Sequence, residues 1–339
     1  MQEEYPVRNG EARDPAQFVI GVDLGGTNAR AALITREGHI ARQARRPSLQ
    51  DQPPDATLGQ IVEACREVIA AEGIAAGQVG GVGIGLPGIM DIHTGVCFWS
   101  PNFAQWQNVP IGPTVGAGLG IPAFILNDAK CAALGELVYG AGKGVRNMVM
   151  ITLGTGIGGA FVVDGKLLIG PNGSIGEVGH QTLDPNGPRC GCGNFGCWEA
   201  MCARDAIIDL ADRKLQAGRP SLLRELAPRG GVTPELVSRA AAENDAVALE
   251  VFNEIGFLLG VGVAGLINIL NPERFVIGGG ISQAGELLFG PIRRTVDRRA
   301  VPMQRKTAEI VPALLGDNAG VMGAAALVLD RLDGITSAL

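Results

Sequence analysis

The chain has 339 residues, of which 46% are hydrophobic and 18% are charged, so it carries enough apolar material for sizeable cores and is not of disordered composition. Its formal net charge is −6 and it has no basic tract, which excludes the electrostatic signature of a nucleic-acid or membrane-surface protein. The 51 glycines have no collagen period. They cluster at the ends of apolar runs, where a backbone needs a positive φ or a close approach to a ligand.

The ends of the chain and its cysteines bear on where the protein works. Residues 1–17 are polar with mixed charge, and we expect a disordered lead-in there and no signal peptide. The longest apolar stretch, residues 257–270, is shorter than the ~20 residues of a membrane span. Four of the seven cysteines lie within residues 190–202, which favours a metal site in a reducing compartment over a disulfide framework. We therefore expect a soluble, cytoplasmic protein without a membrane or nucleic-acid partner.

The first predicted element is a β-hairpin, FVIGVDLGGTNARAALITREGHI, in which two apolar runs flank a Gly-Gly-Thr turn. The segment MVMITLGTGIGGAFVVDGKLLIG has the same pattern. Aligning Gly25 with Gly154 places Asp23 opposite Thr152. A repeated unit about 130 residues away, a spacing close to ordinary domain size, indicates two lobes of related build.

The remaining elements follow from periodicity and from glycine and proline punctuation. We expect a helix over 58–72, a buried strand over 79–88, an irregular stretch over 93–113, a short strand over 123–128 and a helix over 130–139. A Gly/Cys/Pro-rich loop over 174–198 precedes helices from residue 199 onward, with 205–260 mostly helical around a polar break near 216–233. A strand over 275–282 and a small-residue helix over 318–332 complete an α/β pattern.

Two segments, GVGIGLPG and GTGIGG, have the G-x-G-x-x-G spacing of a dinucleotide site, but neither opens into a helix, so that interpretation is rejected. A Walker loop at Gly142-Lys143 is also rejected, because its first glycine is missing. Instead, the hairpin turns can bind phosphate through consecutive backbone N–H groups, assisted by the hydroxyls of Thr27 and Thr155. Asp23 could hold Mg²⁺ through water. Either turn alone is equally compatible with a plain tight hairpin.

Asn127 and Asp128 end an apolar strand and open a helix. Both residue types are preferred helix N-caps, and taken alone this is the better interpretation of the pair. The alternative is a general base at the carboxyl end of a strand, where open α/β sheets bind ligands.

A run of metal-binding residue types is the most specific feature of the chain. His180, Cys190, Cys192 and Cys197 form the Cys₃His set of a closed tetrahedral zinc site, and the intervening glycines let a short loop turn its sulfurs inward. A disulfide is disfavoured, because Cys190 and Cys192 are too close in sequence and the cysteine total is odd. Cys202 follows on a helix and is expected in the core.

Two glutamates, Glu177 and Glu199, flank this loop. Carboxylates accept paired hydrogen bonds from vicinal hydroxyls, so glutamates fixed by a metal loop suit a sugar ring. The alternative is a solvated loop surface, since glutamate is mostly exposed in proteins.

Taken together, these segments resemble the ROK family of sugar kinases, which have the actin-like ATPase (ribonuclease H-like) fold. The resemblance runs from about Phe18 to the C-terminus, and CGCGNFGCWE matches the family signature C-x-C-G-x-x-G-C-x-E at every fixed position. The full zinc motif and SPNFAQW look most like those of bacterial glucokinases. The segments that carry it are DLGGTNAR (23–30), LNDAKCAALGE (126–136), ITLGTGIGGAF (151–161), GEVGH (176–180), CGCGNFGCWE (190–199) and FVIGGGIS (275–282).

The resemblance implies a role for each matching position. Asp128 is the catalytic base. The sugar is held by Gly88, Asn102, Asn127, Asp128, Glu177, His180 and Glu199. ATP is held by Gly25, Gly26, Thr27, Gly154, Thr155, Gly156, Gly278, Gly279 and Gly280, with Mg²⁺ on Asp23 through water and one structural zinc on His180, Cys190, Cys192 and Cys197. Two departures, Asn28 for a lysine and Phe103 for a leucine, bear on donor contacts and sugar specificity.

The resemblance also implies an organisation and an activity. We expect a small lobe of residues 18–126 plus about 317–339, a large lobe of 127–316 with the zinc loop 180–197, and a ligand cleft between them. The expected reaction is transfer of phosphate from ATP to the 6-hydroxyl of a hexose, most simply glucose, by a homodimer or homotetramer. Mannose, fructose, N-acetylmannosamine and N-acetylglucosamine stay open as substrates, as does polyphosphate as donor.

Other activities are considered from the same residues. A non-catalytic sugar sensor would have no use for both Asp128 and two phosphate turns. An ATPase of the same fold would not need hydroxyl-binding carboxylates. The family's repressors carry an N-terminal helix-turn-helix, for which the 17 residues before the first strand leave no room, so we expect no repressor.

Overall fold

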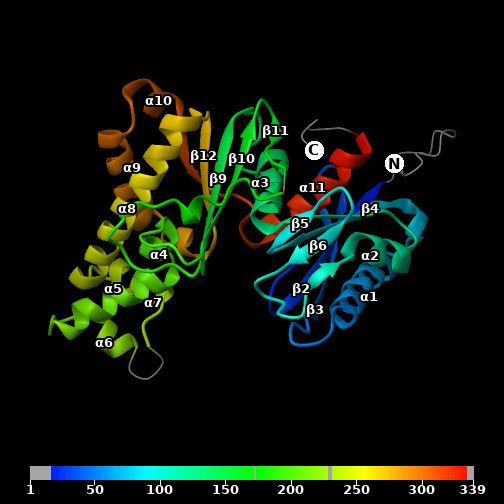
Figure 1. Ribbon diagram of the computed structural model, residues 1–339, viewed down its shortest axis with the longest axis horizontal. Helices are drawn as coiled ribbons and strands as arrows, with labels where there is room; N and C mark the ends of the chain where they lie inside the picture. Colours follow the sequence, from blue (N-terminus) through cyan, green and yellow to red (C-terminus); the bar gives the residue numbers. More distant parts are fainter. Residues whose placement is uncertain (1–16, 172, 228–230, 334–339) are drawn as a thin grey trace.

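Two five-stranded sheets with the same internal order form the framework of the protein in this computed structural model, which describes residues 17–171, 173–227 and 231–333 (Figure 1). The first sheet has the order β3 (Ile40–Pro47), β2 (Asn28–Thr35), β1 (Phe18–Leu24), β4 (Val79–Leu86) and β8 (Ala123–Asn127). The second has the order β11 (Lys166–Leu167), β10 (Ile157–Val163), β9 (Met148–Leu153), β12 (Arg274–Gly278) and β13 (Glu309–Pro312). The lead-in expected over 1–17 lies, except for its last residue, outside the described residues.

The repeat predicted from the two hairpins extends to the whole of each sheet. In both sheets the first three strands pair antiparallel and the last two are added in parallel. Asp23 and Thr152, which the alignment places opposite each other, lie next to the last residue of β1 and β9 respectively. The α/β class and the two hairpins are therefore confirmed.

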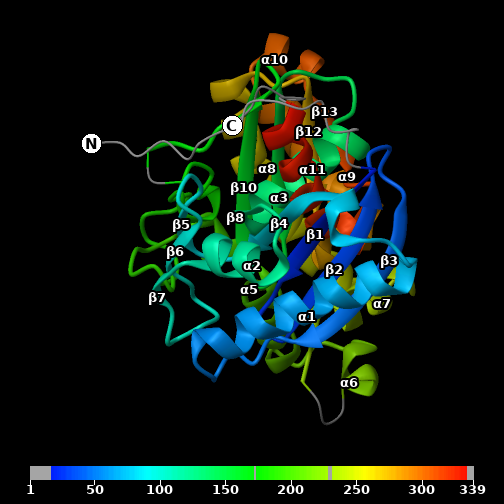
Figure 2. The ribbon, with the colours of Figure 1, turned by 90° about the vertical axis from the view of Figure 1, so that its right-hand side faces the viewer.

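Helices cover both faces of the first sheet. Helices α1 (Pro54–Glu72) and α2 (Ile111–Leu119) lie on its outer side, and Figure 2 shows α1 in front of the strands. On the inner side α11 (Ala319–Asp333) packs directly against β1 and β4. A Cβ at Gly83 would lie 1.8 Å from the carbonyl oxygen of Ala324, so only glycine admits the helix this close. Gly81, Gly83 and Gly85 of GVGIGLPG are thus strand residues that lie under helices, which agrees with rejecting a dinucleotide loop.

Helix α8 (Ala246–Leu270) is the core of the second half of the molecule. It packs against α9 (Glu286–Arg299), α4 (Trp198–Cys202), α5 (Arg204–Gln216) and α7 (Pro234–Ala242). By length and composition it could cross a membrane, with a mean hydropathy of 1.7, but 56% of that window is buried within the protein. Burial of this kind is the signature of a core helix, and it explains an apolar run that continues around the helix.

Several elements depart from the sequence expectations. Helix α1 begins at Pro54 rather than residue 58, and α3 (Asp128–Tyr139) begins two residues early. The stretch expected to be irregular, residues 93–113, contains β6 (Val96–Trp99) and β7 (Gln107–Val109), which form a third sheet with β5 (Ile89–Asp91) just before it. The expected strand over 275–282 stops at Gly278, and η3 (Gly280–Ala284) follows. Strands of three or four residues are too short to show a period, which is why the third sheet was missed.

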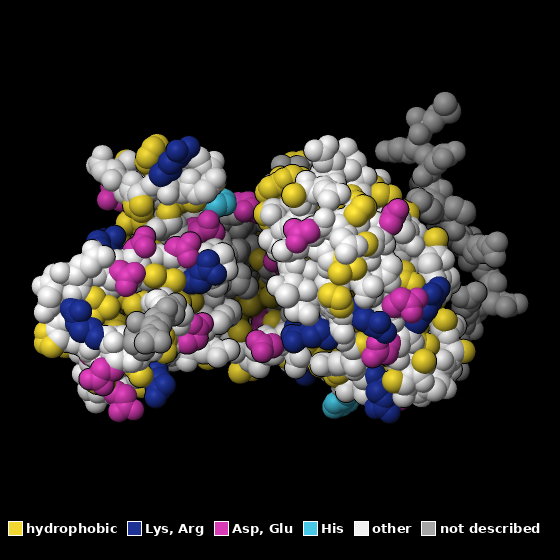
Figure 3. All heavy atoms as spheres, turned by 90° about the horizontal axis from the view of Figure 1, so that it is seen from below, with side chains coloured by type: hydrophobic (Ala, Val, Ile, Leu, Met, Phe, Trp, Pro, Cys, Tyr) yellow, Lys and Arg dark blue, Asp and Glu magenta, His cyan; other side chains and the backbone are white. Residues whose placement is uncertain are grey.

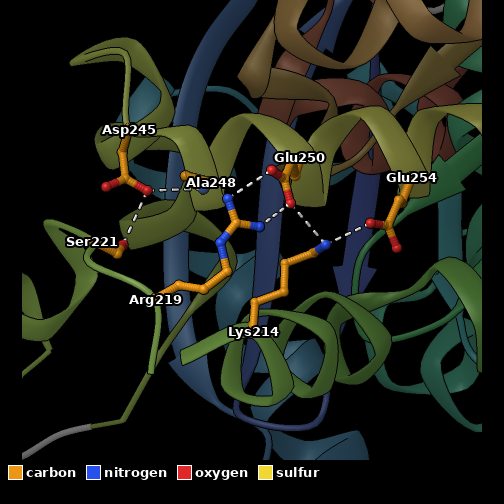
Figure 4. A network of polar contacts seen from close by, with 7 residues as sticks. All are labelled: Lys214, Arg219, Ser221, Asp245, Ala248, Glu250 and Glu254. Atoms are coloured by element: carbon orange, nitrogen blue, oxygen red, sulfur yellow. Dashed lines mark hydrogen bonds and ion pairs between the residues drawn. The ribbon is translucent and has the colours of Figure 1, made fainter. Parts of the chain in front are cut away.

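A polar network holds the segment that interrupts the helical region near residues 216–233, where α6 (Leu223–Leu226) lies (Figure 4). Lys214 and Arg219 both donate to Glu250 on α8, and together they lower the pKa of this glutamate to about 2. Asp245 caps α8 by accepting from the Ala248 N–H at 2.9 Å. These ion pairs lie at the surface and contribute little to stability. Their main effect is to fix the path of the segment between α5 and α8.

A buried carboxylate forms hydrogen bonds with both of the segments that connect the first sheet and its helices to the second sheet. Glu136 on α3 has no exposed surface and accepts from the N–H groups of Ala141 at 2.6 Å, Leu314 at 3.1 Å and Leu315 at 2.8 Å. Residue 141 leads from α3 to β9, and residues 314–315 lead from β13 to α11. The Glu136 carboxylate therefore provides hydrogen-bond acceptors for backbone N–H groups in both connecting segments.

We expect Glu136→Gln to lower the free energy of unfolding by about 2 kcal/mol, because one oxygen is replaced by an amide group facing N–H donors. Urea unfolding checks this. Glu63→Gln, which removes only an exposed pair with Arg66, is the matched control and should change it by less than about 0.5 kcal/mol. Equal effects of the two substitutions would contradict a special role for Glu136.

Candidate functional site

A cavity of about 290 Å³ lies where the two sheets approach each other. Asp23 enters from β1, Asp128 from the start of α3 and Thr152 from β9. The glycines at the end of β12 and the first residues of α11 complete the wall. The space-filling view shows the groove that divides the two bodies of the molecule (Figure 3). The structure thus brings Asp23, Asp128 and the run Gly278, Gly279 and Gly280 into one cavity.

Asp128 faces the cavity, whereas the neighbouring Asn127 caps the helix. The N-cap of α3 is Asn127, whose Oδ1 accepts from the N–H of Ala129 at 3.1 Å and of Lys130 at 3.3 Å. Asp128 accepts one backbone N–H, from Ala129 at 2.8 Å, and stays accessible from the cavity. Loss of hydration raises the pKa of Asp128, and the nearby Asp23 carboxylate adds to the rise. The cap interpretation therefore holds for Asn127 and not for Asp128.

Asp23 faces the N-terminus of α11. A Cβ at Gly320 would lie 2.9 Å from the Asp23 carboxylate carbon, so the helix reaches this carboxylate only because residue 320 is glycine. Arg30 donates to Asp23 at 3.2 Å and to the backbone oxygen of Asp317. Burial raises the pKa of Asp23, against the opposing charge of Arg30. An acidic group and a helix N-terminus facing one cavity are suited to a cation and a phosphate respectively.

The two glycine turns lie beside this cavity and are not among the residues that form its wall. Each is closed by a backbone hydrogen bond, Gly25 N–H to Asn28 and Gly154 N–H to Gly156. None of their glycines has a positive φ, so the turn geometry itself does not require glycine. A Cβ at Gly154 would meet no protein atom within 4 Å, so there is open space beside this turn, although the Gly154 N–H and carbonyl are themselves bonded to Gly156 and Arg204.

Two of the residues expected to bind sugar, Glu199 and Asn102, lie against these turns. The Glu199 carboxylate accepts from the Ile157 N–H at 2.9 Å, and a Cβ at Gly156 would lie 2.2 Å from its Oε2. On the other turn, a Cβ at Gly26 would lie 3.5 Å from the side-chain amide of Asn102. The ring pair of Phe103 and Trp106, stacked at 4.2 Å and fully buried, anchors the loop that carries Asn102.

Other residues expected to bind sugar do not line the cavity. Glu177 is exposed at the start of η2 (Val178–His180), and Gly88 follows β4 with a φ of 131°. A Cβ at Gly88 would lie 2.2 Å from the carbonyl oxygen of Trp99, so the close approach of residue 88 to β6 requires glycine. Of the expected sugar residues, only Asp128 lines the cavity itself.

The Cys/His loop forms one cluster. Ligand atoms of His180, Cys190, Cys192 and Cys197 all lie within 4.8 Å of one another. The sulfurs of Cys192 and Cys197 are 3.7 Å apart, and that of Cys190 is 3.6 Å from Nδ1 of His180. Tetrahedral zinc with Zn–S bonds near 2.3 Å requires a sulfur–sulfur distance of about 3.8 Å, so the donors fit zinc. Cys202 is fully buried and outside the cluster, as expected.

Sequence reasoning missed several residues of the site. Asp317 and Gly320 line the cavity from η4 (Gly316–Asn318) and α11, and Ser282 and Gln283 line it from η3. The small-residue composition of the last helix was the available signal for Gly320, because such a helix can approach other backbone closely. A second cavity, of about 200 Å³, shares Gly280 and Gln283 with the first and extends it toward α7.

Comparisons with known proteins agree with this geometry. The family model described as "ROK family" matches residues 19–331. A glucokinase of Thermotoga maritima is 39% identical over 322 residues, covering 94% of this chain and all of that protein.

Two solved structures of ROK family proteins are similar to this chain. A ROK family glucokinase from Streptomyces griseus, in complex with glucose and AMPPNP, has a TM-score of 0.77 and 34% identity over 91% of this chain and 98% of that one. A ROK family transcriptional regulator, homologous to the E. coli MLC protein, has a TM-score of 0.85 and 30% identity over 95% of this chain and 80% of that one. ROK sugar kinases have the actin-like ATPase fold, which confirms the expected fold. From its repeated sheets to its Cys/His loop, the chain belongs to the ROK family.

Proposed function

We propose that this protein is an ATP-dependent glucokinase that phosphorylates the 6-hydroxyl of glucose. The observation that carries the proposal is Asp128, an accessible carboxylate of raised pKa that shares a cavity with Asp23 and a glycine strand end. Phosphoryl transfer needs a base to orient the hydroxyl and donors to neutralise the phosphates, and little covalent chemistry. Relatives of 36–39% identity that are glucokinases support glucose as the acceptor.

Asp128 takes the proton of the sugar hydroxyl in this mechanism. Its carboxylate is held by the Ala129 N–H, while Asn127 fixes the first turn of α3. Because a raised pKa makes a carboxylate a stronger base, Asp128 is suited to accept the proton as the hydroxyl attacks the γ-phosphate. We assign the remaining sugar hydroxyls to Gly88, Asn102, Asn127, Glu177, His180 and Glu199.

The nucleotide occupies the cavity and its extension. We assign the phosphates to the turns Gly25–Thr27 and Gly154–Gly156, whose N–H groups other than those of Gly25 and Gly154 act as donors. The nucleoside is assigned to Gly278, Gly279 and Gly280 and the second cavity beyond them. The N-terminus of α11 adds its positive dipole end. Asp23 would hold Mg²⁺ through water, and the ion when bound supplies charge neutralisation on the phosphates.

Zinc is assigned a structural role on His180, Cys190, Cys192 and Cys197. A site with four protein ligands leaves no position for substrate. Glu199 follows Cys197 by two residues, and its carboxylate accepts from the N–H of Ile157, the first residue after the second glycine turn. Bound zinc would thus fix the position of Glu199, a proposed sugar-binding residue, relative to the proposed phosphate-binding turn Gly154–Gly156.

The same proposal covers the organisation of the molecule. We infer a small lobe of residues 18–126 with about 317–339 and a large lobe of 127–316, closing over the sugar to exclude water. We further infer a cytoplasmic homodimer or homotetramer. The packing of α11 against β1 and β4 supports the assignment of residues from about 317 to the small lobe.

A sugar-dependent assay tests the activity. We expect ADP release from ATP to require a hexose, and glucose to give the highest kcat/KM among glucose, mannose, fructose, N-acetylmannosamine and N-acetylglucosamine. The assay is repeated with polyphosphate in place of ATP. Higher kcat/KM for another sugar would reassign the substrate, and ADP release without sugar would point to an ATPase.

A sugar sensor is the second candidate, favoured by the similarity to a ROK transcriptional regulator. A sensor would bind glucose without turnover. Glucose at ~100 times its Kd stabilises either protein by about 2.7 kcal/mol, so a rise in melting temperature with no ADP release would identify the sensor.

A further inference from the structure

Arg30 lies directly opposite Asp23 in the first hairpin. The register of β1 and β2 pairs these two residues, and the side chains of directly paired residues lie on the same face of a sheet. The Arg30 guanidinium donates from Nη2 to Oδ2 of Asp23 at 3.2 Å, and the Arg30 side chain is only 18% exposed. Among the residues that the structure describes, no other side chain donates to the Asp23 carboxylate. Arg30 is therefore the group that fixes the direction of the proposed magnesium carboxylate.

The same nitrogen of Arg30 also donates to the backbone oxygen of Asp317, which is 287 residues away along the chain. Asp317 lies in η4, the turn that leads directly into α11. A second side chain of the outer strands, Gln43 on β3, donates to Oδ1 of Asn318 in the same turn at 3.4 Å. The start of α11 is thus bonded to the first sheet through side chains, and of these two Arg30 is the one that also binds Asp23.

The groups that Arg30 holds meet at the cavity. Asp23, Asp317 and Gly320 line its wall, whereas Arg30 does not. A Cβ at Gly320 would lie 3.0 Å from Oδ1 of Asp23 and 3.1 Å from Oδ2, so the first turn of α11 packs against this carboxylate. Arg30 therefore lies behind the wall, where it orients groups of the site without lining the cavity itself.

We propose that Arg30 is a positioning residue that fixes the Asp23 carboxylate and the start of α11 relative to each other for the magnesium-bound nucleotide. This inference rests on the proposed kinase function and deepens it. A carboxylate that holds a metal ion through water must keep its direction. Hydrogen bonds to such a group from the outer shell change metal affinity by roughly 10–100-fold.

Electrostatics alone predicts the opposite effect. Arg30 carries a positive charge close to the proposed place of Mg²⁺, so removing that charge should strengthen binding of the cation. Removing it should also weaken binding of the anionic nucleotide, whether or not Mg²⁺ is present. Only a positioning role predicts that Mg²⁺ improves nucleotide affinity less when Arg30 is lost. The sign of this change therefore separates the two explanations.

Calorimetry of AMPPNP binding tests the proposal, with the Kd in EDTA divided by the Kd in Mg²⁺ as the measured ratio. Arg30→Met, which removes the charge and both hydrogen bonds, should reduce this ratio about tenfold. Arg30→Lys, which keeps a charged donor, should return it to within about threefold of the wild type. Arg46→Met is the matched control, because it removes an exposed ion pair of β3 with Glu67 at 2.7 Å, and it should keep the wild-type ratio. An unchanged or larger ratio in Arg30→Met would overturn the proposal.

Two further measurements separate positioning from a general loss of structure. In Arg30→Met the KM for ATP in the presence of Mg²⁺ should rise about tenfold, while the Kd for glucose stays within about twofold of the wild type. A lower melting temperature accompanied by equal losses of glucose and nucleotide affinity would show a purely structural role, and the proposal would be wrong.

The wild type distinguishes failure of this inference from failure of the proposed function. A wild type that phosphorylates no hexose and binds AMPPNP no more tightly in Mg²⁺ than in EDTA removes the proposed function, and the inference with it. An active wild type whose ratio of Kd values is retained in Arg30→Met removes the inference alone.

Discussion

Asp128→Asn should reduce kcat by about 10³-fold while leaving the Kd for glucose within about threefold of the wild type. The amide keeps the shape and the hydrogen bond from the Ala129 N–H, but it cannot accept the proton of the sugar hydroxyl. A coupled assay gives kcat, and calorimetry gives the glucose affinity. Loss of both together would indicate a folding defect instead of a missing base.

The control for this substitution is Asp205→Asn, which makes the same chemical change at an exposed residue paired with Arg204. It should retain wild-type turnover. The pH profile gives a second check, because loss of hydration raises the pKa of Asp128. Activity should therefore fall on acidification at a pH above the ordinary range of aspartate. A kcat of Asp128→Asn within tenfold of the wild type would contradict the assignment of Asp128 as base.

Cys192→Ser is the second substitution with a large expected effect. The loss of one of four donors should leave less than about 0.2 zinc per chain after dialysis and raise the KM for glucose at least tenfold. The reason is that Glu199 follows Cys197 by two residues and its carboxylate accepts from the Ile157 N–H, so its position depends on the fold of the loop. Metal analysis and steady-state kinetics measure the two quantities.

Cys202→Ala is the matched control, since this cysteine lies a few residues beyond the donor set and is buried in the core. It should retain one zinc per chain and a wild-type KM, even if its melting temperature falls. A metal-free Cys192→Ser protein with a normal KM would show that zinc does not support the sugar pocket.

Local patterns predicted the hairpins and the metal donors because the information lies in adjacent residues. The alternation around Gly25 and Gly154 identified two hairpins, and the structure extends them to two sheets of equal order. The donors from Cys190 to Cys197 lie in eight consecutive residues, so their clustering needs little more than a turn. The third sheet and α2 were missed, because short strands and a glycine-containing helix have no clear period.

The cap at α3 shows where local reasoning ends. Asn127 and Asp128 are equal candidates in sequence, and both residue types are preferred caps. The structure separates them, since Asn127 accepts the two helix N–H groups while Asp128 faces the cavity. The orientation of a side chain at a strand end depends on the sheet that the strand joins, and no local pattern encodes it.

Residue patterns along the chain were enough to predict a glycine-rich α/β protein with a repeated hairpin and a Cys₃His loop, and the resemblance to the ROK family implied its fold. Only the folded chain brings particular charged and polar groups together. Asp23 faces Gly320 near the other end of the chain, and Glu136 on α3 accepts from the N–H groups of Leu314 and Leu315. Electrostatic interactions depend on distance in space and on the loss of water around each group. Both of those quantities arise only when segments far apart in sequence pack together.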